Sequence, residues 1–201
     1  MKQQTPDLNR CSIVIRQYHN FEDIPIDEFR KIWELAYSEQ KELYDVGGSQ
    51  IQQDLEFGPE DPFLQQLEQW KKSLANWRII VALKDEKIIG FLCGTVVDTD
   101  YNVFKYTDNC SFLPVTCIRS FYVINKFRGL RAGVSMLVHF VDSVVLPFCK
   151  RNITIPLEQN QFIVNVPYRN KAGESFFKKF GGKRLQNSNF CKCRLTDIVI
   201  S

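Results

Sequence analysis

Apolar residues recur at three- and four-residue intervals in two stretches of the first third of the chain, and each stretch predicts an amphipathic helix. The first is Ile26–Tyr44, which ends before Gly47 and Gly48. The second is Phe63–Asn76. The acidic connection over 50–62 suits either a substrate loop or a solvated surface turn, and without a ligand the solvated turn is favoured, because acidic loops are common.

Shorter runs rich in β-branched and aromatic residues predict strands, several of them without polar alternation. The runs before the middle of the chain are Cys11–Tyr18, Trp77–Leu83, Lys87–Val97 and Val115–Ile124. A charged turn joins the second to the third, which predicts a hairpin of two central strands covered on both faces. The connection over 98–114 is long for a hairpin, and its interleaved aromatic and acidic residues suit a pocket wall and a covering flap equally well.

The order strand, turn, helix occurs twice in the second half of the chain. After Val115–Ile124 come a basic turn with two glycines and a helix from Val134 to Val145, whose pattern Pro147 is expected to break. After Gln161–Val166, which ends at Pro167, a second turn and helix follow. Lys183–Leu185 and Phe190–Ile200 predict a final hairpin.

Composition adds limits rather than a function. The 201 residues, 44% of them apolar and 24% charged, suit one compact domain over 1–201, with polar Met1–Arg10 as a flexible leader. Lys+Arg 26 against Asp+Glu 23 does not indicate a nucleic-acid surface. No apolar run approaches a membrane span, so the cytoplasm is the default compartment.

The cysteines and histidines indicate neither disulfides nor a metal site. The seven cysteines are odd in number and several fall within apolar strand-like runs, which is typical of reduced core residues. Cys191 and Cys193 lack the spacing and the second pair of a zinc site. His19 and His139 complete no ligand set, so no metal is expected.

The first strand-turn-helix unit predicts an anion site. The first N–H groups of a helix have no partner within the helix, and they point into the preceding turn, where the positive end of the helix dipole also lies. Lys126, Arg128 and Arg131 add positive charge to that turn, and Gly129 and Gly133 allow backbone to approach a ligand closely. An ordinary strand-to-helix turn with surface arginines is the alternative, and a glycine pattern alone would favour it.

Two motifs resemble those of the GCN5-related N-acetyltransferase (GNAT) superfamily. R-G-L-R-A-G, Arg128 to Gly133, resembles its acyl-CoA-binding signature, with Arg131 at the place of the middle glycine. Asn170 to Gly182 resembles its later motif, N-x-x-A-x-x-F-Y-x-K-x-G-F. The resemblance covers roughly 77–185, and it implies an α+β fold (broadly α/β), with a mixed, mostly antiparallel sheet of about seven strands flanked by about four helices.

The resemblance also implies acetyl-CoA or another acyl-CoA as co-substrate. In the family, amides of the basic turn hold the coenzyme A pyrophosphate, and main chain near the end of the preceding strand, here most plausibly the amide of Val123, stabilises the oxyanion. Phe177 is expected against the pantetheine arm, and Asn170 as a coenzyme contact, a helix cap, or both. The residues expected to bind the co-substrate are Phe121, Val123, Ile124, Arg128, Gly129, Leu130, Arg131, Ala132, Gly133, Val134, Asn170 and Phe177.

The implied reaction is direct attack of an amine on the thioester, which needs a base, an acid for the thiolate and an oxyanion donor. Val115–Ile124 contains no carboxylate, and Phe177 stands where many relatives carry a proton-donating tyrosine. Hydroxyls nearby in sequence belong to Tyr122, Ser120 and Tyr168, which are the candidate catalytic residues, although buried strand hydroxyls more often have structural partners.

Two functions remain open at this point. One is an active N-acyltransferase, favoured as an N-acetyltransferase, whose acceptor is an amine-bearing small molecule, a protein amine or a modified nucleotide; longer acyl donors and a homodimer stay open. The other is a catalytically impaired protein that senses acyl-CoA or binds a partner, which the missing tyrosine and Arg131 allow.

Overall fold

The fold is built on one seven-stranded sheet, seen in a computed structural model that describes residues 12–19, 21–44, 61–73, 78–97, 115–151, 161–165, 170–184 and 190–194. The strands are β1 (Val14–Tyr18), β2 (Arg78–Lys84), β3 (Lys87–Val97), β4 (Val115–Val123), β5 (Gln161–Asn165), β6 (Lys183–Arg184) and β7 (Phe190–Arg194). Their order is β1-β2-β3-β4-β5-β7-β6, and only the β4–β5 pair is parallel. The predicted mixed, mostly antiparallel α+β sheet is confirmed.

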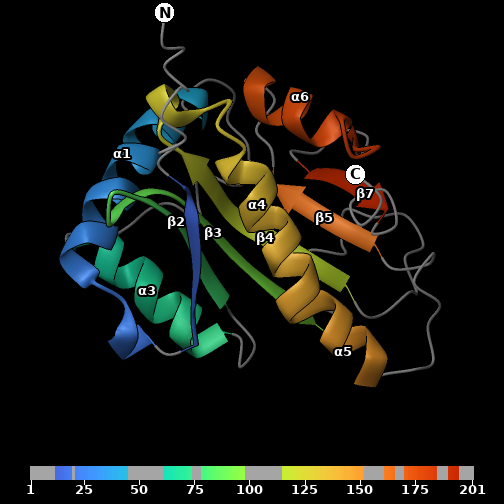
Figure 1. Cartoon of the computed structure of the whole chain (residues 1–201), viewed down its shortest axis with the longest axis horizontal. Helices are drawn as coiled ribbons and strands as arrows, with labels where there is room; N and C mark the ends of the chain where they lie inside the picture. The colour runs from blue at the N-terminus through green and yellow to red at the C-terminus, as the bar shows by residue number, and fades with distance from the viewer. Residues whose placement is uncertain are drawn as a thin grey trace, which may run out of the picture.

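Helices cover both faces of the sheet (Figure 1). They are α1 (Ile26–Tyr44), α3 (Pro62–Ser73), α4 (Ala132–Phe140), the π-helical turn η4 (Val141–Val145), α5 (Leu146–Arg151) and α6 (Lys171–Lys178), with short 3₁₀ turns η1 (Phe21–Asp23) and η3 (Asn125–Phe127). In Figure 1, α4 and α5 cross the front of the sheet as one continuous rod, whereas α1 and α3 lie at its left. Central strand β2 is buried along its middle, as its apolar sequence predicts for a strand covered on both faces.

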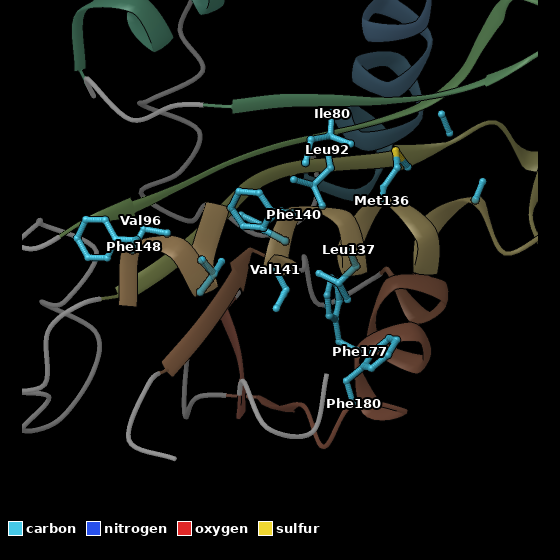
Figure 2. Close-up of a cluster of buried hydrophobic side chains, with 14 of the residues drawn as sticks. Ile80, Leu92, Val96, Met136, Leu137, Phe140, Val141, Phe148, Phe177 and Phe180 are labelled. Carbon is cyan, nitrogen blue, oxygen red and sulfur yellow. The ribbon is translucent and has the colours of Figure 1, made fainter. Parts of the chain in front are cut away.

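One core lies between the sheet and the α4 side. Met136, Leu137 and Phe140 of α4 are fully buried against Ile80 and Leu92 of the sheet. Figure 2 shows Met136 and Phe140 pointing toward the strands and Leu137 pointing toward Phe177 of α6, with Phe180, just after α6, in the same cluster. This core therefore fixes where the N-terminus of α4 stands relative to β4.

The second core lies between the opposite face of the sheet and α1 and α3. Phe29 of α1 packs edge-on against Phe91 of β3, with ring centroids 5.2 Å apart, and also contacts Phe63 of α3. Arg30 and Asp61 link the two helices through a 2.7 Å ion pair. Tyr122 of β4 belongs to this core, so α1 lies over the end of β4.

The helix that begins at Ala132 continues through Pro147, so the predicted break at that residue is wrong. A proline ring normally clashes with the carbonyl four residues earlier. Here the preceding turn is π-helical, and the amide of Leu146 bonds to the carbonyl of Val141, five residues back. The wider turn gives the proline ring room in the first turn of α5, so the helix passes the proline instead of ending.

Other predicted elements are confirmed with small shifts at their ends. The Ile26–Tyr44 helix and the Lys87–Val97 strand have the predicted bounds, and β6 pairs with β7 antiparallel as a terminal hairpin. The first strand begins at Val14 rather than Cys11. The leader and the two connections over 50–60 and 98–114 lie outside the described residues.

Candidate functional site

β4 carries an interruption near its C-terminal end. Its pairing with β3 shifts by one residue between Cys93 and Gly94, which are opposite Ser120 and Ile118, so Arg119 is an extra residue on β4. Such a bulge bends a strand and redirects the side chains that follow it. Beyond it, Ser120 and Tyr122 share the α1 face, whereas Phe121 and Val123 pack on the α4 side.

β4 also extends past its parallel neighbour. Within the described residues, β5 pairs with β4 only over 115–118, whereas β4 continues along β3 to Val123. Alternate backbone groups of 119–123 face the β5 side of the strand, because a strand directs its N–H and C=O groups to both edges. The described pairing leaves them available to a ligand, as an oxyanion donor requires. Ile124 is different, because its amide already donates to the carbonyl of Ile89 at 2.9 Å.

The turn after β4 positions the N-terminus of α4. Gly129 has a φ of 91°, and Arg131, which precedes the helix, has a φ of 65° and a ψ of 2°, the left-handed conformation that glycine adopts most easily. Arg131 therefore keeps the backbone that a glycine would supply at that place in the motif.

The N-terminus of α4 has the groups needed to hold an anion. No side chain caps it, and the first helical hydrogen bond that returns to Arg131 comes from Ser135, at 2.9 Å. The three preceding amides, those of Ala132, Gly133 and Val134, have no acceptor within the helix and lie at the positive end of its dipole. Leu130, beside them, is 48% exposed.

Arg128 turns back toward β4 and α1. Its Nε donates to the carbonyl of Val123 at 2.9 Å, and its Nη2 pairs with Glu39 of α1 at 3.1 Å. The guanidinium also lies 5.7 Å from the ring centre of Tyr122. In this arrangement it positions the end of β4, and the phosphate contact expected from the sequence stays a prediction.

Tyr122 and Glu39 form the shortest polar contact of this network. The Tyr122 hydroxyl donates to Glu39 Oε1 at 2.7 Å, across 83 residues of sequence. Burial raises the pKa of Tyr122 well above its usual value, and the hydrogen bond and the negative charge of Glu39 raise this pKa further. Tyr122 therefore stays protonated at neutral pH, and in this arrangement Glu39 accepts its hydroxyl proton.

Aromatic side chains fill the space between β4, α4 and α6. The Phe121 ring lies 5.2 Å from Phe176 and 5.9 Å from Phe177. A Cβ at Gly133 would approach Phe121 to 3.2 Å and Phe176 to 3.4 Å, so the glycine allows these rings to reach the helix. Phe177 is only 2% exposed and is part of the core, and the half-buried Phe176 is the more accessible ring of α6.

Asn170 caps α6, as the motif predicts. Its side-chain oxygen accepts from the amide of Gly173 at 2.8 Å, which satisfies one of the free donors of the first turn. A second role against the coenzyme stays a prediction. Tyr168 lies outside the described residues.

Solved structures share this fold at low sequence identity. PaiA N-acetyltransferase from Thermoplasma acidophilum, in complex with coenzyme A, matches with a TM-score of 0.53 and 18% identity over 90% of this chain and 97% of that one. PH1933 from Pyrococcus horikoshii OT3 matches with a TM-score of 0.55 and 19% identity, over 90% and 96%. The aminoglycoside N-acetyltransferase AAC(6')-Iy, in complex with CoA, matches with a TM-score of 0.53 and 15% identity over 88% of this chain and 91% of that one.

The fold is that of the GCN5-related N-acetyltransferases. The resemblance carried by Arg128–Gly133 and Asn170–Gly182 is thus confirmed at the level of the fold. No family model matches the sequence, and the search of curated proteins finds no match. At such identities the likeness establishes the GNAT fold and leaves the reaction to be argued from the residues.

The sequence pointed to most of the residues described above but not to Glu39. The basic turn, the end of β4 and the cap of α6 were all identified from motifs. Glu39 continues the inward-facing stripe of Ile32 and Ala36 on α1, at the spacing of one and two helical turns. The sequence signal for Glu39 was a carboxylate in line with the buried residues of α1. Its partners on β4 and in the basic turn could not be identified from the sequence.

The structure also bears on the expectations for metal binding, membrane spans and cysteines. Among the described residues, no cluster of three or more histidine, cysteine or acidic side chains is arranged to hold a metal ion. Within the same residues, no helix is long and apolar enough to cross a membrane. Cys93 is a buried thiol that is not part of a disulfide.

Proposed function

We propose that the protein transfers an acyl group, in the first instance acetyl, from acyl-CoA to an amine. The observation that carries the proposal is the join between β4 and α4. Within the described residues, the bulged strand β4 extends beyond its pairing with β5, and a turn joins it to a helix N-terminus without a side-chain cap. An anionic coenzyme with a thioester at its far end matches these two features. The helix N-terminus offers free amides to phosphate, and the end of β4 offers free backbone groups to the thioester carbonyl.

The co-substrate site comprises the turn and the end of β4. The amides of Ala132, Gly133 and Val134 hold the diphosphate, with Gly129, Leu130 and Arg131 shaping the turn. Phe121, Val123, Ile124 and Phe177 stand along the path toward the thioester as backbone or packing groups. The PaiA and AAC(6')-Iy structures contain CoA in the same fold, which supports acyl-CoA as the co-substrate.

The acceptor is an amine-bearing small molecule or a protein amine. AAC(6')-Iy has been solved in complex with the bisubstrate analogue CoA-S-monomethyl-acetylneamine. Binding both substrates at once favours direct transfer through proximity and orientation over a covalent enzyme intermediate. Tyr122, whose hydroxyl is buried at the end of β4, is the best-placed proton donor; half-buried Ser120 lies on the same face of the strand.

A second function is favoured by one specific observation. Phe177 occupies the position of the family's proton-donating tyrosine and is almost fully buried, so α6 supplies no acid from that residue. A protein that binds acyl-CoA without transferring its acyl group would fit this arrangement.

Acyl-CoA binding and turnover separate the two functions. Binding is measured by calorimetry with coenzyme A and acetyl-CoA, and turnover by free-thiol release from acetyl-CoA with spermidine, kanamycin, a peptide with a free N-terminal amine, and hydroxylamine. We expect binding together with thiol release that depends on an added amine. Binding without thiol release would support the sensing protein, and the absence of binding would overturn both.

A further inference from the structure

We infer that Glu39 of α1 is the proton acceptor for the attacking amine and that Tyr122 passes a proton on to the sulfur of coenzyme A. The inference rests on the proposed function and adds a catalytic pair to it. Neither residue belongs to the two motifs, and the pair is formed only when α1 packs over the end of β4.

Glu39 and Tyr122 are in direct contact at the end of β4. Glu39 Oε1 accepts the Tyr122 hydroxyl at 2.7 Å, which is a short, charge-assisted hydrogen bond. Tyr122 is two residues beyond the Arg119 bulge, on the part of β4 that outruns β5. The pair therefore stands beside the backbone that we assign to the thioester.

The two side chains differ in their exposure to solvent. The Glu39 side chain is 41% exposed, whereas Tyr122 is 5% exposed. An amine arriving from solvent thus meets the carboxylate first, and the tyrosine connects that carboxylate to the interior of the strand. A base must be within reach of the acceptor, which suits the more exposed Glu39. An acid must lie where water is excluded, which suits the buried Tyr122.

Arg128 holds the carboxylate of Glu39 in place. Arg128 Nη2 pairs with the other carboxylate oxygen, Glu39 Oε2, at 3.1 Å, and Arg128 Nε is anchored on the carbonyl of Val123. This two-point contact fixes the orientation of the carboxylate, so that Oε1 faces Tyr122 while Oε2 faces Arg128. Among the described residues, Tyr122 and Arg128 are the titratable or charged groups that contact Glu39.

The reaction balances through this pair. The nitrogen of a neutral amine forms a bond to the thioester carbonyl carbon, the carbon–sulfur bond breaks, and its electron pair leaves with sulfur. The nitrogen proton moves to Glu39. Tyr122 gives its hydroxyl proton to sulfur and regains one from Glu39, so the thiol, the amide, the phenol and the carboxylate are the final species.

The raised pKa of Tyr122 agrees with this coupling. A phenol of raised pKa is a weak acid by itself, so it gives up its proton readily only when another proton replaces it. Glu39, already hydrogen-bonded to that phenol, is placed to supply the replacement.

The decisive experiment compares Glu39→Gln with the matched control Glu34→Gln, an exposed carboxylate on the same helix. Acyl-CoA binding is measured by calorimetry and turnover with the amines named above. We expect Glu39→Gln to lower kcat about 100-fold or more with spermidine or kanamycin, the range of general acid–base catalysis, while the dissociation constant for acetyl-CoA changes by about twofold at most. Glu34→Gln should match the wild type.

Three further readouts distinguish catalysis from a structural role. Hydroxylamine, which is neutral near neutral pH, should lose much less turnover than the alkylamines in Glu39→Gln. Glu39→Asp, which keeps a carboxylate, should recover part of the rate. Tyr122→Phe combined with Glu39→Gln should cost no more than the larger single effect, because both act in one relay.

The outcomes separate this inference from the proposed function. Wild-type turnover that persists in Glu39→Gln, or an equal loss with hydroxylamine and alkylamines, overturns the role of Glu39 and leaves the acyltransferase intact. Failure of the wild type to bind acetyl-CoA, or to turn over any of these amines, overturns the acyltransferase and the inference with it. A thermal melt of each variant identifies any loss caused by unfolding.

Discussion

At the scale of single residues, Arg131 shows that a departure from a glycine motif need not change the backbone. It takes the left-handed conformation with a φ of 65°, as a glycine at that place would do readily. The arginine therefore adds a cation beside the free amides of α4 at the cost of some backbone strain. Such strain at a non-glycine residue amounts to about 1–2 kcal/mol, and a glycine would recover part of it while adding freedom to the unfolded chain.

We predict that Arg131→Gly raises the free energy of unfolding by about 0.5 kcal/mol relative to Arg131→Ala, because both lack the guanidinium but only alanine keeps the Cβ. Urea denaturation of the two variants measures the difference. A glycine variant less stable than the alanine variant would show that the backbone at 131 is not strained.

Tyr122 gives a pH-dependent prediction with a definite sign. Its pKa is raised in the folded protein above its unfolded value of about 10, so between these two values the folded state holds a proton that the unfolded state has lost. This contribution to stability is complete below about pH 10 and is lost as the pH rises further. The urea midpoint of the wild type should therefore fall more steeply above about pH 10 than that of Tyr122→Phe. Parallel curves would contradict the burial and the hydrogen bond to Glu39 that together raise the pKa of Tyr122.

At the scale of elements, the site depends on how helices begin. α4 begins without a side-chain cap, whereas α6 begins at Asn170, whose side chain satisfies the amide of Gly173. The first arrangement leaves donors for a ligand, and the second removes one for stability. The two strand-turn-helix units look alike in sequence but differ in whether a side chain accepts a hydrogen bond from an amide in the first turn of the helix.

Asn170→Ala should lower the free energy of unfolding by about 1 kcal/mol through loss of this cap. Lys171→Ala, which removes an exposed side chain next to it, is the matched control and should change stability by less than about 0.5 kcal/mol. Chemical denaturation measures both. If Asn170→Ala instead leaves stability unchanged and weakens coenzyme A binding, the cap is dispensable and the residue serves the ligand.

Local patterns predicted most elements, and tertiary contacts explain where they did not. The bounds of α1 and β3 follow from periodicity and from the turn residues that end them, which are local properties. Pro147 was misjudged because the π-helical turn that admits it is not encoded in the apolar spacing. The basic turn and the end of β4 were recognised from sequence, but Glu39 meets Tyr122 across 83 residues, and only packing of α1 on the sheet creates that contact.

At the scale of the whole molecule, the two cores place the parts of the site from opposite sides of the sheet. The core beneath α4 sets the helix N-terminus beside the end of β4, and the core beneath α1 sets Glu39 over Tyr122. Arg128 connects the two sides by reaching from the basic turn to Glu39 and to the carbonyl of Val123. The proposal thus assigns coenzyme binding to the α4 side of β4 and the proton-transfer pair to its α1 side.

The most direct test of this account is a titration of isotope-labelled protein with coenzyme A, followed by the NMR shifts of assigned backbone amides. We predict that the largest changes occur at Ala132, Gly133 and Val134, with a second group over 119–123, because these amides are to hold the diphosphate and face the thioester. Saturable shifts confined to other parts of the chain, or no binding at millimolar coenzyme A, would contradict it.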